Sequence, residues 1–92
     1  MALLGESEVQ EKLGQLDGWA LADGAIEKSF KRGDFVGAVE FVSRLVEPAE
    51  EMNHHPDVSI SWETVTVTIS THSEGGLTAA DFELAAKVDA LA

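Results

Sequence analysis

The sequence predicts an α+β fold: a two-layer arrangement in which one four-stranded antiparallel sheet carries helices on one face, in the order α-β-β-α-β-β-α. Two pairs of alternating strand segments, each joined by a short turn, predict the sheet, and three helical segments alternate with these pairs. Apolar and polar residues alternate within each strand, which is typical of a sheet with one buried and one open face. The 92 residues contain no linker or repeat, so we expect a single domain over residues 1–92.

A short first helix is expected near residues 8–16. Ser7 and Gln10 have the spacing of a capping box, and apolar residues follow at helical intervals. Gly18 is expected to end this segment. Two strands should follow, near residues 18–22 and 25–31, because Asp23-Gly24 between two alternating runs is a strong hairpin signal.

The main helix is expected near residues 35–53. Asp34 is suited to the N-cap, and one apolar stripe runs along the segment at spacings of three and four. Pro48 lies inside it and predicts a kink, since proline removes one backbone hydrogen bond. Pro56 biases His55 towards extended geometry, so the helix should end by His54.

A second hairpin is predicted from two alternating β-branched runs, Val58 to Trp62 and Val65 to Ser70. Glu63-Thr64 would form its turn, although this pair is poorly suited to one. The second strand of this hairpin is expected to end in Ser70-Thr71-His72.

The last helix is expected at residues 79–91, opened by a capping box of Thr78 and Asp81. It has one apolar stripe and, roughly opposite, a second apolar surface made of Phe82, Ala85 and Ala86. A monomer does not need both surfaces. We therefore expect the second one to contact another subunit.

Composition excludes several classes of function. The formal charge of -11, from 17 acidic and 6 basic residues, opposes binding to nucleic acid or anionic lipid. The chain has no cysteine, which excludes disulfides and thiolate chemistry. No apolar run approaches the roughly 20 residues of a membrane span, and the first four residues lack the basic start of a signal sequence. A cytoplasmic protein is the expectation.

The three histidines fall in the stretch from Glu50 to Asp81. Their unperturbed pKa of roughly 6.5 suits proton transfer near neutral pH. We expect His54 and His55, at a helix end, to converge with His72 at one edge of the sheet. Neighbouring residues point in different directions, so His54 and His55 should have different roles.

Other interpretations of these residues stay open. The histidines could simply be exposed at the ends of elements, or His54, His72 and Glu50 could bind zinc, although no HExxH-type spacing is present. Glu50 is one turn before His54 and could orient it or be solvated. Asp81 could serve only as a cap, and Gly75-Gly76 is better explained as a turn than as a phosphate site.

The spacing of this stretch resembles the signature of the pterin-4a-carbinolamine dehydratase family. Glu50 is followed after three residues by His54-His55-Pro56, after five more by Trp62, after nine by His72 and after eight by Asp81. Gly18-Trp19, Ile26 to Phe30, Asp34-Phe35 with Ala38, and Ser70 to Thr78 also look like that family.

The resemblance implies a fold, an activity and roles for residues. Members have a four-stranded antiparallel sheet with helices on one side, assemble as dimers or tetramers, and use neither metal nor organic cofactor. They remove water from 4a-hydroxytetrahydropterin to give the quinonoid dihydropterin. His54 and His72 would act as acid and base, and His55 would bind and position the substrate. The resemblance also implies pterin contacts at Asn53, Ser70, Thr71 and Ser73, and carboxylates that hold the imidazoles at Glu50 and Asp81.

Two functions therefore compete. The first is a hydro-lyase acting on 4a-hydroxytetrahydropterins, which recycles pterin for an aromatic amino-acid hydroxylase. The alternative is a non-catalytic interaction module, since some relatives of this fold are partners of transcription factors or of Rubisco assembly. Asn53 stands where many relatives carry Asp, which removes a charge beside the proposed site.

Overall fold

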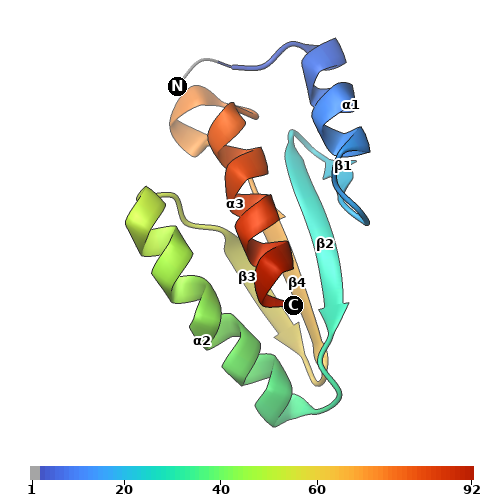
Figure 1. Ribbon diagram of the computed structural model, residues 1–92, viewed down its shortest axis with the longest axis vertical. Coiled ribbons are helices and arrows are strands. Elements are labelled where there is room, and N and C mark those ends of the chain that lie inside the picture. Colours follow the sequence, from blue (N-terminus) through green and yellow to red (C-terminus); the bar gives the residue numbers. More distant parts are fainter. Residues whose placement is uncertain (1–2) are drawn as a thin grey trace.

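A computed structural model describes residues 3–92 and shows one four-stranded antiparallel sheet covered by helices on one face (Figure 1). The elements are α1 (Glu6–Gly14), β1 (Ala20–Ala22), β2 (Ala25–Lys31), α2 (Phe35–Met52), β3 (Asp57–Ser61), β4 (Thr64–Ile69), the 3₁₀ turn η1 (His72–Glu74) and α3 (Ala79–Leu91). The predicted fold class and element order are confirmed. Met1 and Ala2, part of the segment considered for a signal sequence, lie outside the described residues.

The sheet has the strand order β1-β2-β4-β3, so β2 and β4 are central and β3 forms an outer edge. Ile26 pairs with Ile69 and Phe30 with Val65, which aligns the apolar residues of the two central strands on one face. Burial alternates along β4, as it should where one sheet face is covered. The core lies between this face and the helices.

The first hairpin turns at Asp23-Gly24, as predicted. Both residues have positive φ, 49° and 76°, which is the requirement of a type I′ turn.

The second turn was predicted at Glu63-Thr64, and this is wrong. Thr64 is paired on both sides, with Lys31 of β2 and Ser61 of β3, so it belongs to the ladder and the turn falls at Trp62-Glu63. The Glu63 carbonyl accepts a hydrogen bond from the Arg32 backbone N–H at 2.8 Å, which extends the pairing with β2 to the turn itself. Trp62 is held in the left-handed region, with φ 53°.

Helix α1 begins two residues earlier than expected, and Ser7 is not its N-cap. Gly5 is the N-cap, and its N–H donates to the Glu8 side chain at 3.3 Å. Starting at Glu6 puts Glu6 and Glu8 in the first turn, where negative charge is favourable. The helix ends at Gly14, well before Gly18. The backbone N–H groups of the next two residues donate to the carbonyls three residues back, which is the hydrogen-bond pattern of a 3₁₀ turn.

Helix α2 agrees with the prediction at both ends. The Asp34 carboxylate accepts from the Gly37 N–H at 2.7 Å, and the helix continues through Pro48 to Met52. Asn53 follows as a left-handed C-cap with φ 50°. Asparagine tolerates this conformation better than most residues, which explains why Asn is suited to this C-cap position. The kink at Pro48 stays a prediction.

Helix α3 starts at Ala79, as the Thr78–Asp81 capping box predicts, but its second apolar surface is not a free subunit contact. Figure 1 shows α3 between α1 and α2, over the sheet. Phe82 is 7 % exposed and Ala85 is fully buried, and only Ala86 is exposed. A helix that is apolar all round belongs in a core, and that is where this one lies. Among residues 3–92, no helix is long and apolar enough to cross a membrane.

Candidate active site

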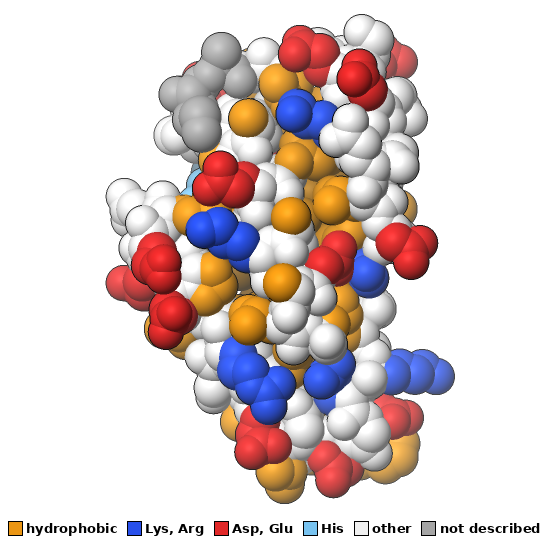
Figure 2. Space-filling view, viewed as in Figure 1, with side chains coloured by type: hydrophobic (Ala, Val, Ile, Leu, Met, Phe, Trp, Pro, Cys, Tyr) orange, Lys and Arg blue, Asp and Glu red, His pale blue; other side chains and the backbone are white. Residues whose placement is uncertain are grey.

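The fold brings the segments that carry the three histidines to one end of the sheet. His54 and His55 lie between the end of α2 and the start of β3, and His72 lies just beyond the end of β4. Asp57 of β3 pairs with Thr68 of β4, so the start of one strand and the end of the other are adjacent. Figure 2 shows histidine at the margin between the end of α2 and the start of α3, with acidic side chains spread over the rest of that face.

His54 is bound to a buried carboxylate. Its Nε2 lies 2.5 Å from Oδ1 of Asp81, and the two side chains are 14 % and 0 % exposed. Oδ2 of Asp81 accepts from the Thr78 backbone N–H at 2.8 Å and from the Thr71 hydroxyl at 2.9 Å. A carboxylate has only acceptors, so the bound nitrogen of His54 carries the proton. The imidazole is therefore held in one orientation.

His55 is paired with Glu50 at 2.6 Å, between Nε2 and Oε2. Glu50 was considered either as the group that orients His54 or as a solvated side chain, and the structure pairs it with His55. The left-handed Asn53 reverses the chain after α2, so one helical turn no longer predicts which side chains meet. Both members are more than half exposed, so the attraction between them is largely screened by solvent.

His72 is the most exposed of the three. Its Nε2 lies 3.7 Å from Oδ2 of Asp57, and both side chains are about three-quarters exposed, at 75 % and 74 %. The expected strand ending at His72 is wrong, because β4 ends at Ile69 and His72 begins η1. Thr71 exchanges backbone hydrogen bonds with Gly76, which closes this turn.

The four residues expected to contact a pterin differ in exposure. Asn53 and Ser73 are exposed, Ser70 is half-buried and Thr71 is buried. The first three therefore have surface to offer to a ligand, whereas the hydroxyl of Thr71 is already used inside the protein.

Two cavities are relevant to ligand binding. One has a volume of about 180 Å³ and places His55 and Glu50 beside an apolar wall from α2 and β3, made of Val42, Leu45, Val46, Ala49, Pro56 and Val58. His54 and His72 do not line it, so the structure does not gather all three imidazoles around this cavity.

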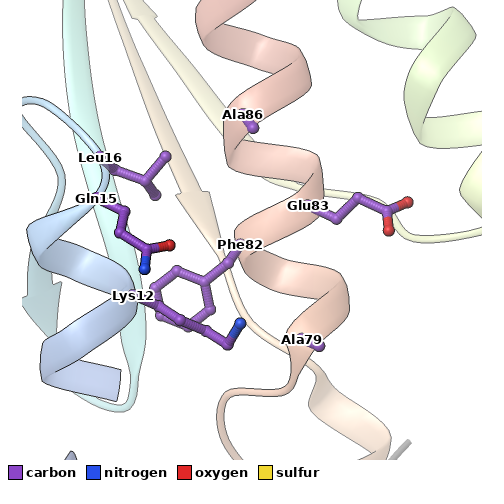
Figure 3. Close-up of a pocket in the computed structure, with 7 residues that line it drawn as sticks. All are labelled: Lys12, Gln15, Leu16, Ala79, Phe82, Glu83 and Ala86. Atoms are coloured by element: carbon purple, nitrogen blue, oxygen red, sulfur yellow. The ribbon is translucent and has the colours of Figure 1, made fainter. Parts of the chain in front are cut away.

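The other cavity is larger, about 420 Å³, and lies between α1 and α3 (Figure 3). Phe82 points towards α1, and Lys12 and Gln15 lie beside its ring. Glu83 also lines the cavity, with its side chain directed away from α1. It contains no histidine. We place the candidate active site at the histidine end, because proton transfer near neutral pH needs groups that this larger cavity lacks.

The zinc interpretation does not fit the geometry. Across residues 3–92, no group of three or more His, Asp or Glu side chains is arranged to hold a metal ion. His54 is bound to Asp81, and Glu50 to His55, so the proposed set of His54, His72 and Glu50 is not assembled.

Comparison with known proteins decides the family. The sequence profile described as "Pterin 4 alpha carbinolamine dehydratase" matches residues 2–91. The chain belongs to the pterin-4a-carbinolamine dehydratase family. It is thereby a member of a family of hydro-lyases.

Curated relatives in this family match along nearly their whole length. A protein of Picosynechococcus sp. is 47 % identical over 88 residues, which is 96 % of each chain. One of Sulfolobus acidocaldarius is 43 % identical over 86 residues, or 94 % of each chain. Both carry the name pterin-4-alpha-carbinolamine dehydratase as an inferred activity.

Two solved structures extend the comparison. A transcriptional coactivator/pterin dehydratase from Brucella melitensis has a TM-score of 0.92 and 43 % identity, covering 97 % of both chains. A pterin dehydratase-like protein described as a RuBisCO assembly factor in the alpha-carboxysome has a TM-score of 0.65 and 26 % identity, covering 79 % of this chain and 84 % of its own. The dehydratase fold therefore occurs in proteins with different described roles.

Sequence reasoning missed two residues at this end of the sheet. Thr78 was assigned only to capping, yet its backbone N–H and its hydroxyl both join the network around Asp81. The capping-box spacing was a usable signal for this. Asp57 lies near His72, and an isolated acid at the start of a strand offered no signal of that contact.

Proposed function

We propose that this chain dehydrates 4a-hydroxytetrahydropterin to the quinonoid dihydropterin and water, with His54 and His72 as the general acid and base. The hydroxyl at C4a must leave with a proton, and the proton on N5 must be taken up. Two imidazoles can serve these two steps. The observation that carries the proposal is the buried pair of His54 and Asp81, which fixes one imidazole beside the accessible end of the sheet.

The other histidines are suited to the remaining roles. His72 is exposed on a short turn and can approach a ligand from the β4 side. His55 lies beside an apolar wall, so it can bind the polar edge of a flat ring whose face packs on that wall. Glu50 holds the His55 ring from the side of α2. Asn53, Ser70 and Ser73 lie within two residues of these histidines along the chain and would supply further hydrogen bonds.

A stopped-flow assay with freshly generated 4a-hydroxytetrahydropterin tests the proposal. His54→Ala and His72→Ala should each lower kcat by about 10²- to 10⁴-fold, the usual contribution of a well-placed acid or base. Gln15→Ala, in the cavity between α1 and α3, is the control and should keep the wild-type rate. If both histidine variants fold normally and stay within about threefold of wild type, these roles are wrong.

The chemistry of the product indicates which class of reaction must follow. A quinonoid dihydropterin must be reduced before the pterin can be used again, so we place the enzyme in the recycling of pterin for an aromatic amino-acid hydroxylase. Loss of hydroxylase turnover in a reconstituted mixture lacking this protein, at limiting pterin, would support the placement. Unchanged turnover would contradict it.

We also propose that the chain forms a homodimer or homotetramer through the outer edge of β3 and the adjoining turn at Trp62. All five residues of β3 are exposed, and its outer side is unpaired within the described sheet. Ile60 is 37 % exposed and Trp62 68 %, and neither lines the cavity beside His55. An exposed apolar edge strand is a template for pairing, and a second copy can pair with it antiparallel.

A non-catalytic interaction module could bind its partner through the same exposed edge. The similarity to the RuBisCO assembly factor is the observation that favours this second candidate function. Ile60→Lys tests assembly through this edge. It should reduce the mass in solution, measured by light scattering, and leave the monomer folded, because edge lysines oppose strand pairing. Unchanged mass would contradict assembly through β3.

A further inference from the structure

Thr71 occupies an unusual position for a residue expected to touch substrate. It is 8 % exposed, and its Oγ1 lies 2.9 Å from Oδ2 of Asp81 and 2.9 Å from Oγ1 of Thr78. A hydroxyl has one proton to donate, and the carboxylate can only accept. Thr71 therefore donates to Asp81, and Thr78 donates to Thr71. The hydroxyl of Thr71 is engaged as donor and as acceptor inside the protein.

These bonds fix the orientation of the Asp81 carboxylate relative to His54. Oδ2 receives two donors, the Thr71 hydroxyl and the Thr78 backbone N–H, while Oδ1 receives His54. Two donors on one oxygen restrict rotation of the carboxylate and keep the other oxygen aimed at the imidazole. The first turn of α3 also stabilises negative charge at this position. A fully buried hydrogen-bonded network of this kind favours a single arrangement.

The consequence for His54 concerns its other nitrogen. Nε2 carries the proton bound to Asp81, so Nδ1 is the nitrogen that can exchange a proton with a ligand. Among residues 3–92, the hydrogen bonds of the structure engage only Nε2 of the His54 ring. The His54 side chain is 14 % exposed, so a ligand can reach the ring.

We propose that Thr71 is a positioning residue, which acts through Asp81 to hold His54 with its proton on Nε2 and with Nδ1 free for proton transfer. Its hydroxyl is not a pterin contact. This reassigns a residue that the family resemblance places among the substrate contacts. The effect of Thr71 on catalysis rests on the proposed dehydratase function. The hydrogen bonds among Thr71, Asp81 and His54 do not depend on that function.

Three variants test the role by kinetics. Thr71→Val keeps the shape and removes the hydroxyl, and Thr71→Ser restores it. Thr68→Val is the matched control, because Thr68 on β4 also donates its hydroxyl to a carboxylate, that of Glu27 at 3.0 Å, in a pair that is separate from the Asp81 network. Thr71→Val should lower kcat about tenfold. This is less than the roughly hundredfold loss that a 1 Å misplacement of a catalytic group can cause, because the Thr78 N–H still holds Asp81.

The split between kcat and KM distinguishes positioning from binding. KM should stay within about twofold of wild type in Thr71→Val, because a group that acts only on the catalytic imidazole does not change ground-state binding. Thr71→Ser and Thr68→Val should both resemble wild type. A raised KM with unchanged kcat would show that Thr71 contacts substrate, and wild-type kinetics in Thr71→Val would show that it does neither; each result overturns the proposal.

A second measurement does not depend on activity. Nitrogen-15 NMR of the imidazoles should show the neutral His54 ring protonated on Nε2, with that proton exchanging slowly with water. Exchange should be faster in Thr71→Val and unchanged in Thr68→Val. A wild-type His54 with its proton on Nδ1 overturns the proposal even if Thr71→Val fails to fold. If the NMR result holds and no dehydration occurs, the proposed function fails and the arrangement stands.

Discussion

Replacing Asp81 by Asn tests how much the buried network contributes to the fold. The substitution keeps the shape and removes the charge from a carboxylate that is 0 % exposed and receives three hydrogen bonds. The amide oxygen can still accept from Thr71 and the Thr78 N–H. The amide nitrogen would then face His54, where a donor meets a donor unless the imidazole moves its proton to Nδ1.

The size of the effect follows from the bonds that lose their charge. Hydrogen bonds to charged groups contribute about 1.5–3 kcal/mol and neutral ones about 0.5–1.5 kcal/mol, and the favourable interaction with the start of α3 is also lost. We expect Asp81→Asn to lower the free energy of unfolding by about 2–4 kcal/mol. For a domain of this size, that corresponds to a fall in Tm of roughly 10–30 °C.

Urea unfolding followed by circular dichroism measures this loss, and the chain provides a matched control. Asp34 is also a capping residue, with its carboxylate on the Gly37 N–H at 2.7 Å, but it is exposed. Asp34→Asn should cost less than about 1 kcal/mol, because Asn and Asp are nearly equal as N-caps. Equal losses in the two variants would refute the reasoning, since burial and charge at Asp81 would then contribute nothing beyond capping.

Three further predictions follow from the core, the site and its chemistry. Phe41→Ala should lower the free energy of unfolding by about 3–5 kcal/mol, because Phe41 is fully buried with its ring 4.9 Å from that of Phe30; a loss below about 1 kcal/mol in urea unfolding would contradict this packing. Glu50→Gln should raise KM more than it lowers kcat and leave Tm within a few degrees, because its pair with His55 is exposed; a large fall in kcat alone would give Glu50 a different role. Dialysis against a chelator should leave the dehydration rate unchanged, because the described histidines are bound to carboxylates and not arranged around a metal; loss of activity restored by zinc would contradict the acid–base proposal.

Features set by neighbouring residues could be predicted from the sequence. The Asp23-Gly24 turn needs only positive φ at two positions, and the start of α3 needs only the spacing of Thr78 and Asp81. The Asp34 cap is equally local. In each case the deciding interaction joins residues that are at most three positions apart.

Features decided by distant parts of the chain could not be predicted. The apolar surface at Phe82 and Ala85 suggested a subunit contact, because the sequence does not show that α3 lies between two other helices and the sheet. The partner of Glu50 is a local feature that helical spacing also missed: the left-handed C-cap at Asn53 turns the chain so that Glu50 meets His55 and not His54. The turn at Trp62 depended on pairing of Thr64 with both neighbouring strands.

The central claim is that His54, His55 and His72 act on one bound pterin, although His55 alone of the three lines the cavity between α2 and β3. Titrating a stable dihydropterin into nitrogen-15 labelled protein, and following the three imidazole signals, tests it most directly. We predict that all three signals shift along one binding curve with the same Kd. Shifts confined to His55, or three different curves, would contradict a shared site.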